Sequence, residues 1–469
     1  MKLGFIDRLV PAERILRKQE LQGTMPKSSE VLGQYLRLAW PSVTECVLIG
    51  LISFADTAMV GAVGDEAIKA VGICAQPRLL LLTPTLALGA AMTALSARRT
   101  GEGKREDVNR VLRVGFLLGM AIMVVLAALG AIFAEPFLRL AGAADSYMEL
   151  AMAYFRIICI ATLFTTANSA VNAVQRGSGN TRIPMTSNII GNLVNILFNW
   201  LLIGGVGPFP RLGVQGAAIA TTMGGAVSLM VSSSLLLKRE NYVNLWYKCS
   251  WRFSRDILKP LAKVGTGAVV EDLSCRVGFF LVAMMNARLP GLDYTAHVAA
   301  SQVTSLSYNF VNGFGVACAA LAGQYLGQKR SDKAYLLSGI ARRVVMTVSL
   351  LLAVCFITMQ RGIMGLFTET EAVIDRGAPL MYIAAIITFC QGLVNVSTGC
   401  LRGAGDTRYT GRVYLISVAV IRPIMCYLMV YVLHWGLWGS WLAMLLDQLL
   451  RTVLFLRRAG RGEWLKIKL

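Results

Sequence analysis

Long apolar stretches repeat along almost the whole chain, and they constrain its fold more than any other feature. Each is roughly 20 to 30 residues long, and a helix needs about 20 residues to cross a hydrocarbon core of about 30 Å. Of the 469 residues, 55% are hydrophobic and only 15% are charged, which is the composition of a membrane protein. We therefore predict an all-α polytopic membrane protein with twelve transmembrane helices, at 38–63, 67–97, 108–133, 147–175, 183–205, 213–237, 259–287, 293–325, 337–360, 375–401, 411–433 and 437–458.

The basic residues fall mainly on one side of this helix map. A formal net charge of +20 would suggest a nucleic-acid partner in a soluble protein, but most Lys and Arg lie in the termini and in the loops after even-numbered spans. The opposite loops hold only Lys69, Arg139, Arg211, Arg288, Arg361 and Arg376, and the spans themselves hold Arg78, Arg156, Arg276, Arg422 and Arg451. This positive-inside pattern predicts a bacterial inner-membrane protein with both termini in the cytoplasm and no nucleic-acid partner.

The two halves of the chain repeat one another at a constant offset. The sequence RGSGNTR at 176–182 matches RGAGDTR at 402–408, and one three-residue slip aligns Gly213 with Gly436. Each repeat contains an even number of crossings, so we predict two pseudo-symmetric six-helix bundles related by an axis along the membrane normal. The predicted domains are a basic N-terminal segment at 1–37, a bundle at 38–237, a linker at 238–258, a second bundle at 259–458 and a tail at 459–469, with segment, linker and tail in the cytoplasm.

Acidic residues inside the predicted spans are the first candidates for a functional site. A carboxylate in the membrane is costly unless it is paired, hydrated or protonated, and Asp56 lies in the first span. Glu45 lies eleven residues earlier, close to three helical turns, so it shares a face with Asp56, and Glu271 matches Glu45 in the second repeat. We predict that these acids bind an ion, although each could instead form a structural salt bridge. Pro41 removes a backbone donor from the same span, which favours a bend and a gating role.

Polar side chains at helical spacing predict further site residues in both halves. The fifth span carries four Asn at steps of four, three and four, which places them on one face. They are Asn188, Asn192, Asn195 and Asn199, and similar ladders occur in the fourth span (Thr165, Asn168, Asn172, Gln175), the eighth (Gln302, Ser305, Asn309, Asn312) and the tenth (Gln391, Asn395, Thr398). Because such faces are costly in lipid, they line polar cavities or form hydrogen bonds between helices.

Two arginines inside the spans also require partners. Asp56 or Glu45 could serve Arg78, and Asp447 could serve Arg422. The sequence contains no catalytic triad and no cluster of metal ligands, since its two histidines have no suitable neighbours along the chain. We therefore do not expect an enzyme.

These motifs resemble those of the multidrug and toxic compound extrusion (MATE) family. Pro41 followed by Asp56-Thr57 and Val60-Gly61 resembles the first span of the family, and LRGAGDTR at 401–408 resembles its repeated turn. The resemblance covers about residues 38 to 464. It implies a V-shaped pair of bundles that, by alternating access, exchange H+ or Na+ for amphipathic, often cationic, organic compounds.

The resemblance also assigns roles to particular residues. It matches Asp56 to the coupling acid of the family and Asn195 to an Asn near that acid, so a Na+ ion could bind near both. Asn199 falls where one branch of the family has a second Asp. We further expect a monomer in the lipid bilayer, with organic small molecules as substrates and with no cofactor besides the coupling ion.

Two alternatives remain at this point. A lipid-linked saccharide flippase of the same superfamily would need a basic central cavity for pyrophosphate, for which Arg78, Arg156 and Arg276 are candidates. A membrane-embedded enzyme would need a nucleophile, a metal or a histidine cluster, and His297 and His434 have no such company.

Overall fold

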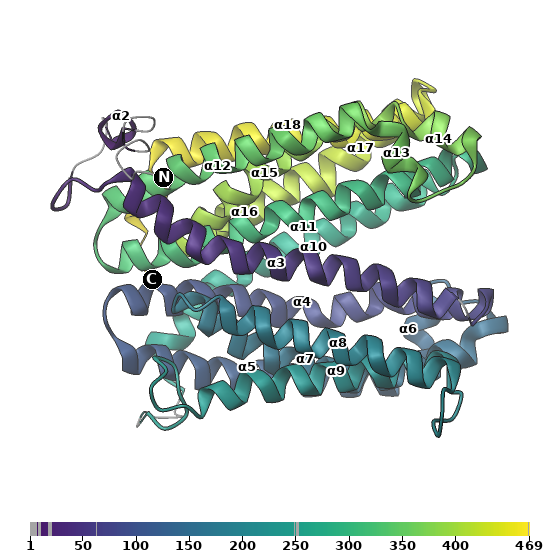
Figure 1. Ribbon diagram of the computed structural model, residues 1–469, viewed down its shortest axis with the longest axis horizontal. Coiled ribbons are helices and arrows are strands. Elements are labelled where there is room, and N and C mark those ends of the chain that lie inside the picture. Colours follow the sequence, from purple (N-terminus) through teal and green to yellow (C-terminus); the bar gives the residue numbers. More distant parts are fainter. Residues whose placement is uncertain are drawn as a thin grey trace. The chain divides into compact units, whose positions relative to one another are not determined.

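Helices are the only regular secondary structure in the described part of the chain, as the sequence predicted (Figure 1). The computed structural model describes residues 7, 11–16, 21–61, 63–247, 249, 253–467 and 469, without the side chains of 53–55, 57, 58, 61 and 65. Arg8, Arg17 and Lys18 of the predicted basic N-terminal segment lie outside the described residues.

Each predicted span falls on a long helical segment. The segments are α3 (Ser28–Gly61), α4 (Asp65–Gly101), α5 (Arg105–Ile132), α7 (Asp145–Gly177), α8 (Arg182–Gly204), α9 (Gly213–Leu236), α10 (Arg255–Asn286), α11 (Gly291–Gly327), α12 (Ser331–Thr358), α15 (Leu380–Ala404), the continuous run of α16 (Thr407–Tyr414), η1 (Leu415–Ile421), α17 (Arg422–Tyr427) and η2 (Leu428–Val432), and α18 (Gly436–Arg461). Five short helices join or flank them: α2 (Ala12–Leu16), α6 (Ala134–Leu140), α13 (Gln360–Gly365), α14 (Glu371–Gly377) and η3 (Glu463–Lys466).

Ten of these segments, within the described residues, are long and apolar enough to cross a membrane. α10 and α11 are not among the ten, although they contain 32 and 37 residues. In α10 the reason is charge, because Lys259, Lys263, Glu271, Asp272 and Arg276 lower its mean hydropathy. A charged helix of this length requires neighbouring helices that pair its ionised groups.

The helix boundaries reproduce the sequence repeat. The offset that places position 176 on position 402 also places both ends of α4 on the ends of α11, and both ends of α5 on the ends of α12. Helix packing repeats as well, because α7 packs against α4, α5 and α9, while α15 packs against α11, α12 and α18. The pseudo-symmetry of the two six-helix sets is therefore confirmed.

The chain forms two compact units, which divide inside two helices. Unit 2 is Val47–Gly265, and unit 1 combines Met1–Cys46 with Thr266–Leu469. The first half of α3 belongs to unit 1 because α11 meets it closely, and a Cβ atom at Gly313 would collide with the backbone of Val43. The bundle limits predicted at 38–237 and 259–458 follow the repeat, whereas the compact units divide α3 and α10.

The fourth helix of each repeat lies at the centre of its unit. In unit 2, Phe155 of α7 is fully buried in an apolar cluster that includes Met123 of α5. In unit 1, Ile387 of α15 lies in a cluster with Phe356 of α12 and Trp441 of α18. Because α7 and α15 are central, much of their polar ladders also lies buried inside the units.

Candidate functional site

Two amides of α8 hold the carboxylate of Asp56 on α3. Asn199 Nδ2 donates to Asp56 Oδ1 at 2.7 Å. When the Asn195 nitrogen faces the carboxylate, it donates to the two oxygens at 2.9 and 3.2 Å, and the Asn195 oxygen accepts the N–H of Thr221 at 3.1 Å. Asp56 is half-buried and both asparagines are buried. The structure thus brings three of the residues singled out from the sequence into one cluster within unit 2.

Close packing of α8 on α9 positions this cluster. A Cβ atom at Gly191 would lie 2.6 Å from the carbonyl oxygen of Gly224, and one at Gly224 would lie 2.8 Å from Cβ of Asn195. Small residues at such a contact let helix backbones approach closely. The contact brings Thr221 of α9 beside Asn195, and it requires glycine at both positions.

Asp56 also has a cationic neighbour at longer range. Arg78 of α4 lies within electrostatic range of the carboxylate, without a direct ion pair among the described residues. Tyr154 of α7, which is buried, lies within range of both groups. Asp56 is therefore held mainly by neutral amide donors, an arrangement that leaves its charge available to another cation.

The lower-numbered asparagines form a separate hydrogen-bond network between α7, α8 and α9. Asn168 Nδ2 donates to Asn188 Oδ1 at 2.9 Å and to Ser228 Oγ at 2.8 Å. Asn168 Oδ1 accepts from Asn172 Nδ2 at 3.2 Å and from Ser232 Oγ at 2.9 Å. Three of these four bonds join different helices, and the bond between Asn172 and Asn168 lies within α7. In the same unit, Asn192 and Thr165 are half-buried, and Thr165 Oγ1 donates to the carbonyl of its own helix at Ala161, at 3.0 Å.

Glu271 of α10 is buried in an ion pair. It binds the guanidinium of Arg402 on α15, and Thr410 Oγ1 of α16 donates to Glu271 Oε2 at 2.7 Å. Its repeat mate Glu45 is also buried, and it belongs to unit 1 with the first half of α3. Pro41 is buried in the same half-helix, next to the close approach of α11 at Gly313.

The ladders of unit 1 differ in exposure. On α15, Gln391 and Asn395 are buried, and Asn395 Nδ2 donates to the carbonyl of Gln391 at 2.9 Å. On α11, Gln302 is exposed and Asn309 is half-buried. The structure therefore places the α15 ladder inside the unit and the first residue of the α11 ladder at its surface.

The expected pairing of Arg422 with Asp447 is wrong. Asp447 instead accepts two hydrogen bonds from Arg451 of its own helix, at 3.1 and 2.7 Å, and both side chains are buried. The spacing of four residues makes this pair local. Arg422 lies over the ring of Phe279, with the guanidinium carbon 4.9 Å from the ring centre.

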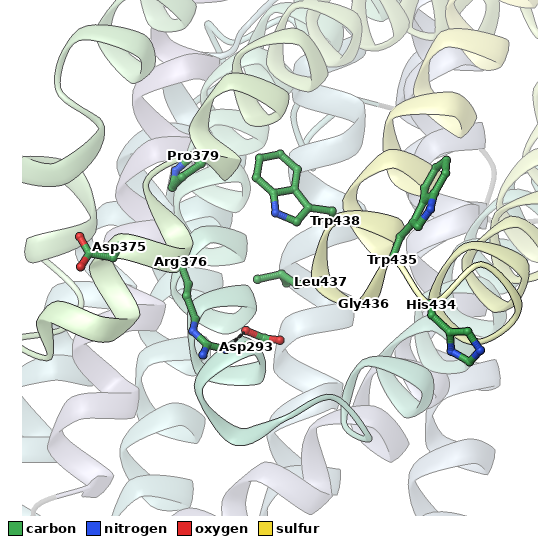
Figure 2. A pocket seen from close by; sticks show the side chains of 9 residues that line it. All are labelled: Asp293, Asp375, Arg376, Pro379, His434, Trp435, Gly436, Leu437 and Trp438. Atoms are coloured by element: carbon green, nitrogen blue, oxygen red, sulfur yellow. Dashed lines mark hydrogen bonds and ion pairs between the residues drawn. The ribbon is translucent and has the colours of Figure 1, made fainter.

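A cavity of about 350 Å³ lies at the end of unit 1 where α11 and α18 begin (Figure 2). It is lined by Asp293, Asp375, Arg376, Pro379, His434, Trp435, Gly436, Leu437 and Trp438. Arg376 is ion-paired with Asp293, and Asp375 accepts from Arg361 at 2.6 Å. Half-exposed indoles beside charged groups are typical of a membrane–water interface. None of the ion-coupling or substrate-binding residues predicted from the sequence lines this cavity.

The donor set around Asp56 suits a monovalent cation better than a transition metal. Among the described residues, no group of three or more His, Cys, Asp or Glu side chains could hold a metal ion. Asn199 Oδ1, however, is buried and has no hydrogen-bond partner in the described part of the chain. Carboxylate, amide and hydroxyl oxygens from Asp56, Asn199 and Thr221 are the hard ligands that Na+ prefers.

Comparisons with known proteins agree with this arrangement. The MatE family model matches residues 41–201 and 268–428, which are equivalent parts of the two repeats. The chain is 26% identical over 390 residues to the multidrug resistance protein NorM of Photobacterium profundum, covering 80% of this chain and 82% of that protein. It is 31% identical over 202 residues to the FAD transporter of Shewanella oneidensis, covering 43% of this chain and 45% of that protein.

A solved structure shows the same fold. The outward-facing conformation of a multidrug resistance MATE family transporter matches this structure with a TM-score of 0.85 at 21% identity, covering 95% of this chain and 100% of that one. The duplicated helix sets and the family match define a multi-pass membrane transporter, not an enzyme. The chain belongs to the MatE family, the family of MATE transporters. None of these comparisons supports a flippase of lipid-linked saccharides.

Sequence reasoning missed several residues that complete these clusters. Thr221, Ser228 and Ser232 of α9 contact the asparagines, and their spacing of seven and four residues was a readable signal of one helix face. Arg402 was read as part of a turn motif, although a buried Glu271 required a cation. The repeat contains several arginines, so the sequence did not show which of them pairs with Glu271.

Proposed function

We propose that this protein is a secondary active antiporter that exports organic compounds from the cytoplasm in exchange for H+ or Na+. The observation that carries the proposal is the carboxylate of Asp56, held by Asn195 and Asn199 inside unit 2. The likeness to NorM of Photobacterium profundum, whose name is that of a multidrug resistance protein, supports amphipathic, often cationic, compounds as the substrates.

The geometry suggests how ion and substrate compete. In the structure the two amide nitrogens donate to Asp56 and so stabilise its anionic form. A proton on Asp56 would remove one acceptor, and a Na+ ion would require the amides to turn their oxygens inward. Either event neutralises the carboxylate, so that a cationic compound loses its counter-charge and leaves. We propose that Na+, where it is the coupling ion, binds between Asp56 and Asn195 with Asn199 Oδ1 as a further ligand.

Asp56 is a better coupling residue than Glu271. Glu271 already has a guanidinium and a hydroxyl as partners, so that release of Arg402 would have to accompany any ion binding there. Glu45 is the second candidate, because it is a buried acid on the same helix as Asp56.

We place the organic substrate against polar faces inside the units. The ladder residues that the asparagine network of α7 to α9 does not include are available for this contact. Those that lie at least half-buried include Thr165 and Asn192 in unit 2, and Asn309, Gln391 and Asn395 in unit 1.

Transport in this proposal proceeds by alternating access of the two bundles. Pro41 lies in the half of α3 that belongs to unit 1, whereas Asp56 lies in the half that belongs to unit 2. A bend near Pro41 could therefore link the state of Asp56 to a gate. We further propose a monomer in the inner membrane with both termini in the cytoplasm, as the basic loops indicate.

Purified protein in liposomes tests the function directly. A fluorescent organic cation is followed while a pH gradient and a Na+ gradient are imposed in separate experiments. We expect accumulation of the dye under at least one gradient, and collapse of that gradient by an ionophore should stop it. Dye movement that neither gradient changes would reject the antiporter.

The two asparagine clusters predict different mutant phenotypes. Asn168→Ala removes four hydrogen bonds inside a buried network, so the free energy of unfolding should fall by about 2 kcal/mol. The dependence of dye transport on the gradient should remain. Asn199→Ala removes a donor from Asp56, and we expect it to change the pH or Na+ concentration at half-maximal transport with little loss of stability. Thermal unfolding in detergent and the liposome assay measure both quantities, and a reversed pattern would show that the roles of the two clusters are exchanged.

A further inference from the structure

Arg422 is the one buried cation of unit 1 whose charge has no anionic partner among the described residues. Its side chain is 8% exposed, and its Nε atom is buried without a hydrogen-bond partner. The described contact of its guanidinium is the ring of Phe279 on α10. A cation–π contact attracts a guanidinium but supplies no counter-charge, and a charge without a counter-charge is costly in the membrane interior.

The carboxylate of Asp447 does not serve as the counter-ion of Arg422. Asp447 lies within electrostatic range of Arg422, but both of its oxygens bind Arg451. A bidentate pair satisfies a carboxylate geometrically and neutralises it. The vicinity of Arg422 therefore keeps a net positive charge.

Two further hydrogen-bond donors without acceptors accompany Arg422. Trp441 of α18 is 1% exposed, and its Nε1–H has no partner in the described part of the chain. His297 Nε2 of α11 lies 3.1 Å from Asn286 Nδ2. With the amide nitrogen donating in this contact, the ring carries its proton on Nδ1, which is buried and has no hydrogen-bond partner among the described residues. The rings of His297 and Trp441 meet edge to face at 6.0 Å, and Arg422 lies within electrostatic range of His297.

The backbone around Arg422 is also unusual. The helix changes from η1, a π-helix, to α17 at this residue and returns to a π-helix at η2. Short π-helical segments widen a helix and occur frequently at functional sites. A widened turn aims a side chain differently from a regular helix, and here it precedes Pro423, which removes a backbone donor.

We propose that unit 1 contains a binding site for the anionic group of a transported compound, a carboxylate or a phosphate. Arg422 supplies the charge, and Trp441 Nε1 and His297 Nδ1 supply neutral donors. The site lies between α10, α11, α17 and α18. The inference rests on the proposed export function for its substrate, and it predicts that zwitterionic or anionic compounds are preferred over related compounds that carry only positive charge.

A matched pair of dyes tests the site. Rhodamine 110 carries a free carboxylate, and rhodamine 123 is its methyl ester with the same ring system. Equilibrium binding is measured by fluorescence anisotropy in nanodiscs of phosphatidylcholine. We expect the wild type to bind rhodamine 110 more tightly. In Arg422→Gln the affinity for rhodamine 110 should fall at least tenfold, and the affinity for rhodamine 123 should change less than twofold.

Control variants separate charge from fold. Arg422→Lys should retain most of the preference, and Trp441→Phe should weaken rhodamine 110 binding about threefold while keeping the aromatic packing. Arg457→Gln, on an exposed part of α18, should change neither dye. Should Arg422→Gln fail to fold, the lysine and phenylalanine variants still test the proposal. An anion site predicts that Arg422→Lys keeps the preference for rhodamine 110 and that Trp441→Phe weakens the binding of rhodamine 110 selectively.

A lipid headgroup and a soluble compound present the same anionic chemistry, and a second set of nanodiscs distinguishes them. If phosphatidylglycerol competes with rhodamine 110 in the wild type but not in Arg422→Gln, a headgroup can fill the site. If it does not compete, the site selects the soluble compound.

Equal binding of both dyes by the wild type, or equal losses of both in Arg422→Gln, would overturn the proposal. Gradient-driven export of rhodamine 123 in the same preparation reports on the antiporter independently. If export of rhodamine 123 persists but the protein does not prefer rhodamine 110, only the anion site is rejected. If the protein prefers rhodamine 110 but no gradient drives export, only the antiporter is rejected.

Discussion

Asp56→Asn should abolish gradient-driven export while the protein remains folded. The substitution keeps the size of the side chain and removes its charge, so it mimics a carboxylate that permanently carries its proton. One carboxylate cannot favour both the driving cation and a cationic substrate. Linkage then requires that each lowers the affinity of the other by the same factor. In the mutant, substrate affinity should lose its dependence on pH or Na+, which is an observable separate from the transport rate.

The measurements are dye accumulation in liposomes and equilibrium dye binding across pH and Na+ concentration. Glu45→Gln and Glu271→Gln are the matched controls, because each removes one buried carboxylate from a long helix. We expect them to retain coupling. If Asp56→Asn exports dye at the wild-type rate under the same gradient, Asp56 is structural, and whichever control abolishes transport identifies the coupling acid.

Asp447→Leu should cause a large loss of stability in unit 1. It leaves Arg451, whose side chain is 5% exposed, without its carboxylate. Removing one partner of a buried ion pair costs about 3 to 5 kcal/mol, because the other charge stays buried and uncompensated. Reversible unfolding in detergent measures the change in the free energy of unfolding.

A double variant and a surface pair provide the controls. Asp447→Leu with Arg451→Met replaces the whole pair by apolar side chains, and it should recover most of the lost stability. Asp375→Asn breaks a pair with Arg361 whose side chains are 60% and 59% exposed, and it should change the stability far less than Asp447→Leu because solvent screens an exposed pair. A single Asp447→Leu variant as stable as the wild type would mean that Arg451 is satisfied without this carboxylate, for example by the ring of Tyr414 beneath it.

Much of the fold was readable in the sequence because it depends on local periodicity. Twelve apolar stretches predicted the positions of the long helical segments, and the constant offset between the repeats reappears between the ends of α4 and α11 and between those of α5 and α12. Hydrophobic length fixes where a chain can cross a bilayer, and it does so segment by segment. The candidate Asp56 was also readable, because a carboxylate in an apolar stretch stands out without knowledge of its neighbours.

The sequence did not show which residues form each polar cluster. The four asparagines of α8 share a face by periodicity, yet Asn188 joins the network with Asn168 whereas Asn195 and Asn199 hold Asp56. The division depends on which parts of α3, α7 and α9 lie beside each turn of α8. Glycines at 191 and 224 decide that approach, and a sequence pattern does not show which glycines meet.

The sequence by itself determined the class of fold, the repeat, and the polar positions that had to be inside the protein. Only the tertiary structure decided the partners, because an ion pair depends on distances of a few ångströms between different helices. In the structure Glu271 pairs with Arg402, Asp447 pairs with Arg451, and Arg422 has no carboxylate partner among the described residues. Periodicity predicts which face of a helix is polar, whereas the packing of the helices decides which residues that face contacts.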